Sequence, residues 1–248
     1  MSSNTLANLL NPSVPSDDAI IIPDGPTISY SQYKDEVERV AGLLAGAGVM
    51  HGRPVSIILP NSLEFMILFL AVARAGAVAA PLNSEYTTEE FKFFMEDANS
   101  QLAIIPESTH QGREAANELG IPVIDTSLNN GSVVLRENGQ NLTNSSDPQP
   151  PSEEDVALFL HTSGTTSRPK GVPLTHANLM KSINNIKTHY ELTPEDTSII
   201  VMPLFHVHGL MGASLSTLNS GGSLIIPPRF SASNFWELQK NNSATWYS

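Results

Sequence analysis

Cysteine is absent from the 248 residues, which excludes disulfides, thiolate metal sites and cysteine nucleophiles. Long apolar runs are absent as well. The most apolar stretch, residues 65–82, contains Arg74 and falls short of the roughly 18 uninterrupted residues that a membrane-spanning helix needs. Residues 1–18 have neither an early cation nor a sustained apolar core, so they do not resemble a secretory signal. We therefore expect a protein that is not secreted and that has no transmembrane segment.

Basic residues are scarce. The chain has 13 Lys and Arg against 25 Asp and Glu, and the resulting net charge of −12 argues against nucleic acid as the main partner. The acidic excess is confined to residues 1–160, whereas residues 161–248 carry slightly more basic than acidic side chains. This skew would favour an anionic ligand in the second part of the chain. Acidic helices that keep the first part hydrated would produce the same skew.

Helical and strand patterns alternate along the chain. Apolar periodicity and capping residues, among them Ser31 and Thr175, predict helices over residues 31–47, 62–75, 88–99, 175–190 and 233–240. Short apolar runs predict strands over residues 20–23, 27–30, 55–59, 77–81, 102–105, 155–161, 198–202, 223–227 and 244–247. This order predicts an α/β fold with largely parallel sheets flanked by helices.

The segment 138–154 is dense in Asn, Ser and Pro and has no apolar period. Such a composition is typical of a surface loop. We therefore expect it to link two α/β lobes, a first lobe over residues 1–137 and the start of a second over residues 155–248.

Hydroxyls, glycines and one cation gather in LHTSGTTSRPKG, residues 160–171, directly after an apolar run. Phosphate oxygens need convergent donors, a close approach of the backbone and a positive charge; here five Ser and Thr hydroxyls, Gly164, Gly171 and Lys170 supply them. Pro169 disfavours helix at Arg168, so the segment should remain a loop. It is not a Walker A loop, because proline precedes the lysine and no Ser or Thr follows it. The ordered string predicts a nucleotide triphosphate site; the alternative is a solvated Ser/Thr/Gly loop.

The string TSGTTSRPKG resembles the phosphate-binding signature TSG[ST]TGxPKG of the acyl-adenylate-forming superfamily, with Ser167 at the usual glycine position. The longer string HTSGTTSRPKGVPLT is similar to the oxalate-CoA ligase branch of plants and fungi. The resemblance implies that Lys170 is catalytic. It also implies that ATP is bound by Thr162, Ser163, Gly164, Thr165, Thr166, Ser167, Arg168, Pro169 and Lys170.

A second motif is VMPLFHVHGL, residues 201–210, which is similar to PLFHVHGL of the same branch. The apolar run 198–202 predicts a strand that Pro203 ends, and ligands in open α/β sheets bind at the carboxyl ends of strands. His206 and His208 could be a structural pair or, with a third ligand, a metal site. The resemblance implies a third role, with His206 catalytic and lining the acyl or nucleotide site, and with His206, His208 and Gly209 contacting the substrate; no protein metal site is implied.

The resemblance also implies a two-step reaction, in which a carboxylate and ATP give acyl-AMP and pyrophosphate and the thiol of CoA then displaces AMP. ATP, Mg²⁺ and CoA would be required, and a small carboxylic acid, with oxalate favoured, would be the substrate. No covalent enzyme nucleophile is needed, which agrees with the absence of cysteine and of a GxSxG motif. The alternatives are a medium-chain acyl or aryl CoA ligase of the same superfamily and a noncatalytic nucleotide-binding or interaction protein.

The predicted strand at residues 244–247 stops at Ser248 without a following turn or partner. We therefore expect the chain to be the N-terminal portion of the adenylate-forming fold, without its C-terminal lobe and inactive by itself. A peroxisomal address would lie at a later C-terminus, so the predicted location is the cytoplasm or the peroxisome.

Overall fold

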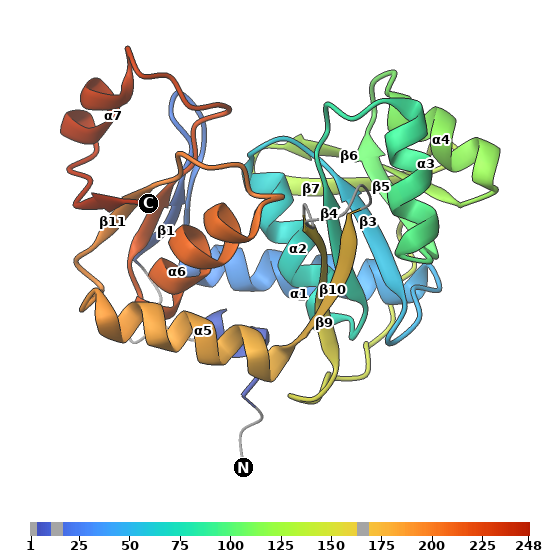
Figure 1. Cartoon of the computed structure of the whole chain (residues 1–248), viewed down its shortest axis with the longest axis horizontal. Coiled ribbons are helices and arrows are strands. Elements are labelled where there is room, and N and C mark those ends of the chain that lie inside the picture. Colours follow the sequence, from blue (N-terminus) through green and yellow to red (C-terminus); the bar gives the residue numbers. More distant parts are fainter. Residues whose placement is uncertain (1–3, 11–16, 163–168) are drawn as a thin grey trace.

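Two β-sheets and the helices around them make up the computed structural model, which describes residues 4–10, 17–162 and 169–248 (Figure 1). The predicted α/β class is confirmed, because the sheets are mostly parallel and helices connect their strands. Within these residues, no helix is long and apolar enough to cross a membrane.

The larger sheet has eight strands in the order β10-β9-β4-β3-β5-β6-β7-β8 among the described residues. Its centre, from β9 to β6, is parallel, and β7, β8 and β10 run antiparallel to their neighbours. The bounds are β3 Pro54–Ile58, β4 Val78–Leu82, β5 Leu102–Pro106, β6 Val123–Asn129, β7 Ser132–Glu137, β8 Gln140–Asn141, β9 Val156–Thr162 and β10 Lys170–Thr175.

The smaller sheet has five described strands in the order β13-β11-β12-β1-β2. All its pairings are parallel except the one between β1 and β2, a hairpin at the sheet edge. The bounds are β1 Asp18–Ile21, β2 Thr27–Ser29, β11 Thr197–Ile199, β12 Ser223–Ile225 and β13 Trp246–Tyr247.

The sheets do not follow the predicted division at residues 138–154. Strands β1 and β2, from the expected first lobe, belong to the sheet of β11–β13, and β9 and β10, from the expected second lobe, belong to the sheet of β3–β8. The division into contiguous lobes 1–137 and 155–248 therefore needs correction. Its physical reason is that β1 finds its parallel partner in β12, about two hundred residues later, whereas β9 pairs with β4.

Helices α1 Tyr30–Gly46 and α2 Leu63–Arg74 pack on each other, and Tyr33 Oη donates to Met66 O at 2.9 Å between them. Both contribute to the largest group of buried apolar side chains, which also contains Ile20 of the smaller sheet and Val55 of the larger one. The two sheets therefore share one core. A second core lies where α3 Thr88–Asp97 and α4 Gln111–Leu119 cover β5, away from α1.

The remaining described helices lie against one of the two sheets or against other helices. They are the 3-10 helix η1 Leu6–Leu10, α5 His176–His189, the π-helix η2 His208–Leu215, α6 Ser216–Ser220 and α7 Phe235–Asn241. Thr175 caps α5 as predicted, and its hydroxyl accepts from Asn178 N. The cap of α1 is Ser29, not Ser31, because the Ser29 hydroxyl accepts from Gln32 N while the Gln32 side chain accepts from Ser29 N.

Candidate functional site

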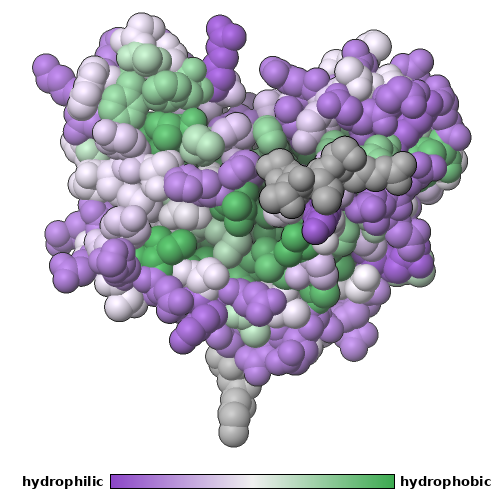
Figure 2. All heavy atoms as spheres, in the orientation of Figure 1, coloured by the Kyte–Doolittle hydropathy of each residue, from purple (hydrophilic) through white to green (hydrophobic). Residues whose placement is uncertain are grey.

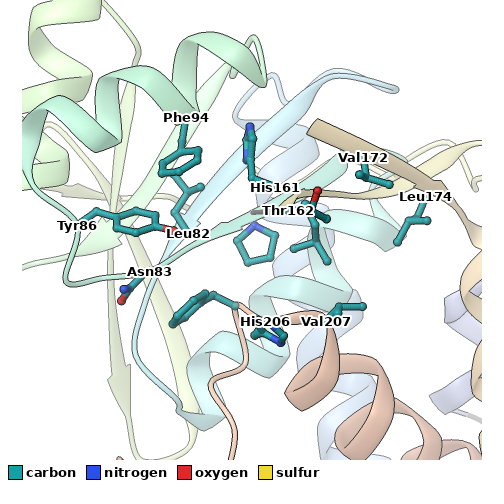
Figure 3. A pocket seen from close by; sticks show the side chains of 13 residues that line it. Leu82, Asn83, Tyr86, Phe94, His161, Thr162, Val172, Leu174, His206 and Val207 are labelled. Atoms are coloured by element: carbon teal, nitrogen blue, oxygen red, sulfur yellow. The ribbon is translucent and has the colours of Figure 1, made fainter. Parts of the chain in front are cut away.

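A pocket of about 520 Å³ opens where β4 and β9 end. Its walls come from parts of the chain that lie far apart in sequence, and they include Asn83, Tyr86, Phe94, His161, Thr162, Val172, Leu174, Phe205 and His206. His206 and Val207 lie across the pocket from His161 and Phe94 (Figure 3). On the outside, Figure 2 shows apolar side chains gathered in the middle of this face, between α6 and β10.

The ends of the predicted phosphate segment lie beside this pocket. Thr162 ends β9, Lys170 begins β10, and the two residues pair directly in the antiparallel ladder. Thr162 lines the pocket. The predicted nucleotide-binding residues Ser163, Gly164, Thr165, Thr166, Ser167 and Arg168 lie outside the described residues.

The Lys170 side chain is exposed, and its ammonium forms no hydrogen bond or ion pair with another residue of the described ranges. Pro169, the residue before it, is half-buried. No Asp or Glu is among the described residues that line the pocket. A cation at the rim and walls without carboxylates suit an anionic ligand.

His206 is the predicted substrate residue that reaches the pocket. Its Nδ1 accepts a hydrogen bond of 3.3 Å from the backbone N of His208. An accepting Nδ1 places the proton of the neutral imidazole on Nε2, so the ring can offer one N–H donor to an oxygen of a ligand.

His208 and Gly209 do not line the pocket. His208 Nε2 lies 2.8 Å from Ser248 Oγ. A Cβ on Gly209 would lie 2.5 Å from Pro203 O and 2.7 Å from Met202 O, so a glycine is needed for this close backbone approach. The metal interpretation of the two histidines finds no third ligand, because the described residues contain no group of three His, Asp or Glu side chains able to hold an ion.

His161 was not among the predicted site residues, although it directly precedes Thr162. Its side chain is 8% exposed, and its Nε2 lies 2.9 Å from Asp97 Oδ2 at the end of α3. The rings of Phe94 and Phe159 pack edge-on against the imidazole, with centroid distances of 4.6 and 5.2 Å. The available signal was the position of His161 near the end of an apolar strand that leads directly into the predicted loop.

Gly171 pairs with His161 in the ladder of β9 and β10. A Cβ at Gly171 would collide with the ring of Phe159 and lie 3.1 Å from Asp97 Oδ2. The second glycine of the motif thus gives space to the aromatic packing around His161, in addition to any approach to an anion.

Tyr86 and Asn83, also missed, come from the connection between β4 and α3. The Tyr86 ring stacks on Phe94 at a centroid distance of 4.8 Å. Burial, and then the carboxylate of Glu90, raises the pKa of the Tyr86 phenol, so this hydroxyl stays protonated near neutral pH. Asn83 Oδ1 accepts from Glu85 N at 3.1 Å and the side chain stays on the pocket wall.

Comparison with known proteins shows which family this chain resembles. The family model described as AMP-binding enzyme matches residues 12–248. Oxalate--CoA ligase of Arabidopsis thaliana is 44% identical over 257 aligned positions, which cover 100% of this chain and 50% of the relative. Oxalate--CoA ligase of Saccharomyces cerevisiae is 32% identical, covering 93% of this chain and 48% of the relative. The chain spans about half the length of the curated relatives it matches.

Solved structures agree with this result. The ATP-bound crystal structure of MatB from Rhodopseudomonas palustris superposes with a TM-score of 0.85 at 30% identity and covers 99% of this chain and 49% of MatB. A long-chain-fatty-acid-CoA ligase from Archaeoglobus fulgidus has the same fold, with a TM-score of 0.85 at 21% identity. With the family model matching nearly every residue and both motifs meeting at one pocket, this chain belongs to the AMP-binding enzyme family.

Proposed function

We propose that this chain forms the nucleotide-binding and acid-binding part of an ATP-dependent acid–CoA ligase. One observation carries the proposal: a single pocket brings His206 of the PLFHVHGL motif beside Thr162, where the phosphate motif begins. In the first step, a carboxylate oxygen attacks the α-phosphorus of ATP, the bond to the β-phosphate breaks and pyrophosphate leaves. In the second step, the sulfur of CoA attacks the acyl carbon and AMP leaves.

The residues divide this work by their chemistry. Thr162 to Thr166 and Lys170 hold the β- and γ-phosphates, and the Lys170 cation offsets the charge that builds up on the departing pyrophosphate. The Nε2–H of His206 donates to an oxygen of the acid or of the α-phosphate. Mg²⁺ arrives with ATP, because the described residues contain no carboxylate cluster for a resident metal and phosphate oxygens are good magnesium ligands.

For the acid we propose a small carboxylate, with oxalate favoured. The support is the name of the Arabidopsis relative and the polar groups on the pocket wall, namely Asn83, Tyr86 and His206. A medium-chain acyl or aryl acid is the second candidate, supported by the apolar Phe94, Val172 and Leu174 on the same wall.

Acid-dependent exchange of labelled pyrophosphate into ATP tests both candidates. The complete protein encoded by the gene is assayed with oxalate, malonate, octanoate and 4-coumarate. Oxalate should give the highest kcat/KM. A preference for octanoate or 4-coumarate would replace oxalate with the second candidate. ATP binding without exchange for any acid would instead favour a noncatalytic nucleotide-binding protein.

We also infer that residues 1–248 alone do not complete thioester formation, since they span about half of the matched relatives. The proposed location is the cytoplasm or the peroxisome. Fluorescence microscopy of the complete protein, tagged at its N-terminus, distinguishes the two locations.

A further inference from the structure

Asn61 lies between β3 and α2, one residue before Ser62, the N-cap of α2. Its side-chain amide makes two hydrogen bonds to the backbone of a distant segment. Asn61 Nδ2 donates to Met202 O at 3.2 Å, and Asn61 Oδ1 accepts from Leu204 N at 2.8 Å. One planar amide thus holds the chain on both sides of Pro203.

The segment held in this way leads directly to His206. His206 N donates to Pro203 O at 3.1 Å, and Leu210 N donates to His206 O at 3.0 Å at the start of the following helix. The backbone of His206 is therefore tied to Pro203, and the residues on either side of Pro203 are tied to Asn61. Leu204, between them, is fully buried.

A second contact limits the same segment. Gly209 approaches the carbonyl oxygens of Met202 and Pro203 so closely that a Cβ would stand 2.7 and 2.5 Å from them. The turn from Met202 to Gly209 is consequently packed on itself, while Asn61 fixes it to the larger sheet. Strand β11, from which the turn departs, belongs to the smaller sheet.

We propose that Asn61 is a positioning residue for His206: its amide sets where the PLFHVHGL turn, and with it the imidazole, stands in the pocket. This inference rests on the proposed function for what His206 does to the substrate. Only a side chain with a donor and an acceptor at this spacing satisfies both Met202 O and Leu204 N. Aspartate at this position keeps the acceptor for Leu204 N but places a negatively charged oxygen against Met202 O. Leucine has a similar size and removes both hydrogen bonds.

Hydrogen–deuterium exchange tests the placement without any assay of activity. In the complete protein, Asn61→Leu should speed exchange of the Leu204 amide and of the His206 and Leu210 amides by about tenfold, because these hydrogen bonds then open locally. Asn61→Asp should speed exchange at the same amides, but the Leu204 amide should remain the better protected one. Exchange in β11 and β12 should not change.

The matched control is Asn144→Leu. Asn144 Nδ2 likewise donates to a distant backbone carbonyl, Gly46 O at 3.2 Å, but on the loop against α1. This variant should leave exchange at Leu204 and His206 unchanged. Faster exchange throughout the protein in Asn61→Leu would assign Asn61 to general stability and overturn the proposal, and so would unchanged exchange at Leu204.

A double-mutant cycle with His206→Ala then tests whether Asn61 acts through the imidazole. Alone, Asn61→Leu should lower kcat/KM for the acid roughly tenfold or more in pyrophosphate exchange, since small misplacements of a catalytic group are costly. Added to His206→Ala, it should cause no further loss. If the loss of kcat/KM in the double variant equals the product of the two single losses, Asn61 does not act through His206 and the proposal is overturned. If the wild-type protein shows no pyrophosphate exchange, the proposed function fails. The hydrogen–deuterium exchange result alone then decides whether Asn61 positions the turn.

Discussion

At the residue scale, the side chains of Lys170 and His161 differ in how they are held. The Lys170 side chain is exposed, and its ammonium has no partner among the described residues, so its charge is available to a ligand. His161 is enclosed by Phe94 and Phe159 and paired with Asp97, so its ring is fixed. The first is suited to bind phosphate, and the second to keep the end of β9 in place.

Lys170→Ala should therefore impair chemistry much more than folding. We expect pyrophosphate exchange by the complete protein to fall roughly 100- to 1000-fold, as for other groups that stabilise transition-state charge. The free energy of unfolding should change by about 0.5 kcal/mol or less, because the side chain is exposed. Lys181→Ala, which removes an exposed cation on α5, is the control. Unchanged exchange in Lys170→Ala would rule out the phosphate role.

Substitutions at His161 separate its hydrogen bond from its packing. His161→Phe keeps a ring against Phe94 but loses the hydrogen bond to Asp97, whereas His161→Ala loses both. We expect both variants to weaken ATP binding, measured by titration calorimetry, and only the alanine variant to lose about 1–3 kcal/mol of unfolding free energy in urea. Wild-type ATP affinity in both variants would show that the position of β9 does not depend on this pair.

At the residue scale the sequence predicted His206 and Lys170 through their motifs, and the structure places His206 on the pocket wall and Lys170 opposite Thr162. Asp97, Tyr86 and Asn61 could not be predicted. Asp97 and Asn61 reach the site through long-range contacts that their local sequence does not indicate, and Tyr86 reaches it because the connection between β4 and α3 lies at the pocket.

At the element scale, capping and apolar period predicted helices α1, α2, α3, α5 and α7 but not α4. Residues 62–75 and 88–99 became α2 and α3, with bounds shifted by one or two residues. The apolar residues Val37, Val40, Leu43 and Leu44 of α1 are buried. These helices could be predicted because capping residues and apolar periodicity involve residues that are close together in the sequence. The short helix at residues 233–240 is α7, but it begins at Phe235 without a side-chain cap hydrogen bond.

The contact between η1 and α5 depends on a histidine that must stay neutral. His176, the first residue of α5, is 1% exposed, and its Nδ1 accepts from Leu6 N at 3.2 Å. Burial lowers the pKa of His176 to about 4; the nearby carboxylate of Asp155 opposes this shift and His51 adds to it. A protonated ring could no longer accept this hydrogen bond, and it would place a positive charge in buried surroundings.

Stability should consequently fall as the solution becomes acidic. The unfolded chain binds a proton at His176 below about pH 6.5, whereas the folded chain resists protonation down to a pKa of about 4. This contribution to stability is complete above pH 6.5 and is lost progressively between pH 6.5 and 4. His176→Asn, which can still accept from Leu6 N, should flatten this part of the profile in urea unfolding. An unchanged slope between pH 6.5 and 4.5 would contradict the assignment.

At the scale of the whole molecule, strand pairing was the part that the sequence could not predict. The composition of residues 138–154 predicted a surface segment, and most of these residues are exposed. The predicted lobe boundary was wrong, because the sequences of β1 and β12 do not indicate that the two strands pair across the chain. Contact between distant strands is decided by the shared core, in which Ile20 and Leu224 pack together with side chains of the larger sheet.

A fragment of residues 155–248 should therefore not fold as a unit. It would lack β1 and β2 of the smaller sheet, and its β9 and β10 would have no β4 to pair with. We expect a collapsed amide spectrum in ¹H–¹⁵N NMR and no cooperative thermal transition. Addition of residues 1–154 in trans should restore dispersion if the two pieces complement each other. A well-dispersed spectrum of the isolated fragment would show that the interleaved strands are dispensable.

The interleaving of the two sheets also sets a rule for recombining this chain with its relatives. A crossover inside residues 138–154 is attractive because the segment is exposed, yet both sheets of the hybrid would then contain strands from two parents. Mismatches would fall at the buried pairings of β1 with β12 and of β4 with β9. Exchanges bounded so that β1, β2 and β11 to β13 come from one parent keep each of these strand pairs within one parent, and the remaining mismatches then fall in the core that the two sheets share.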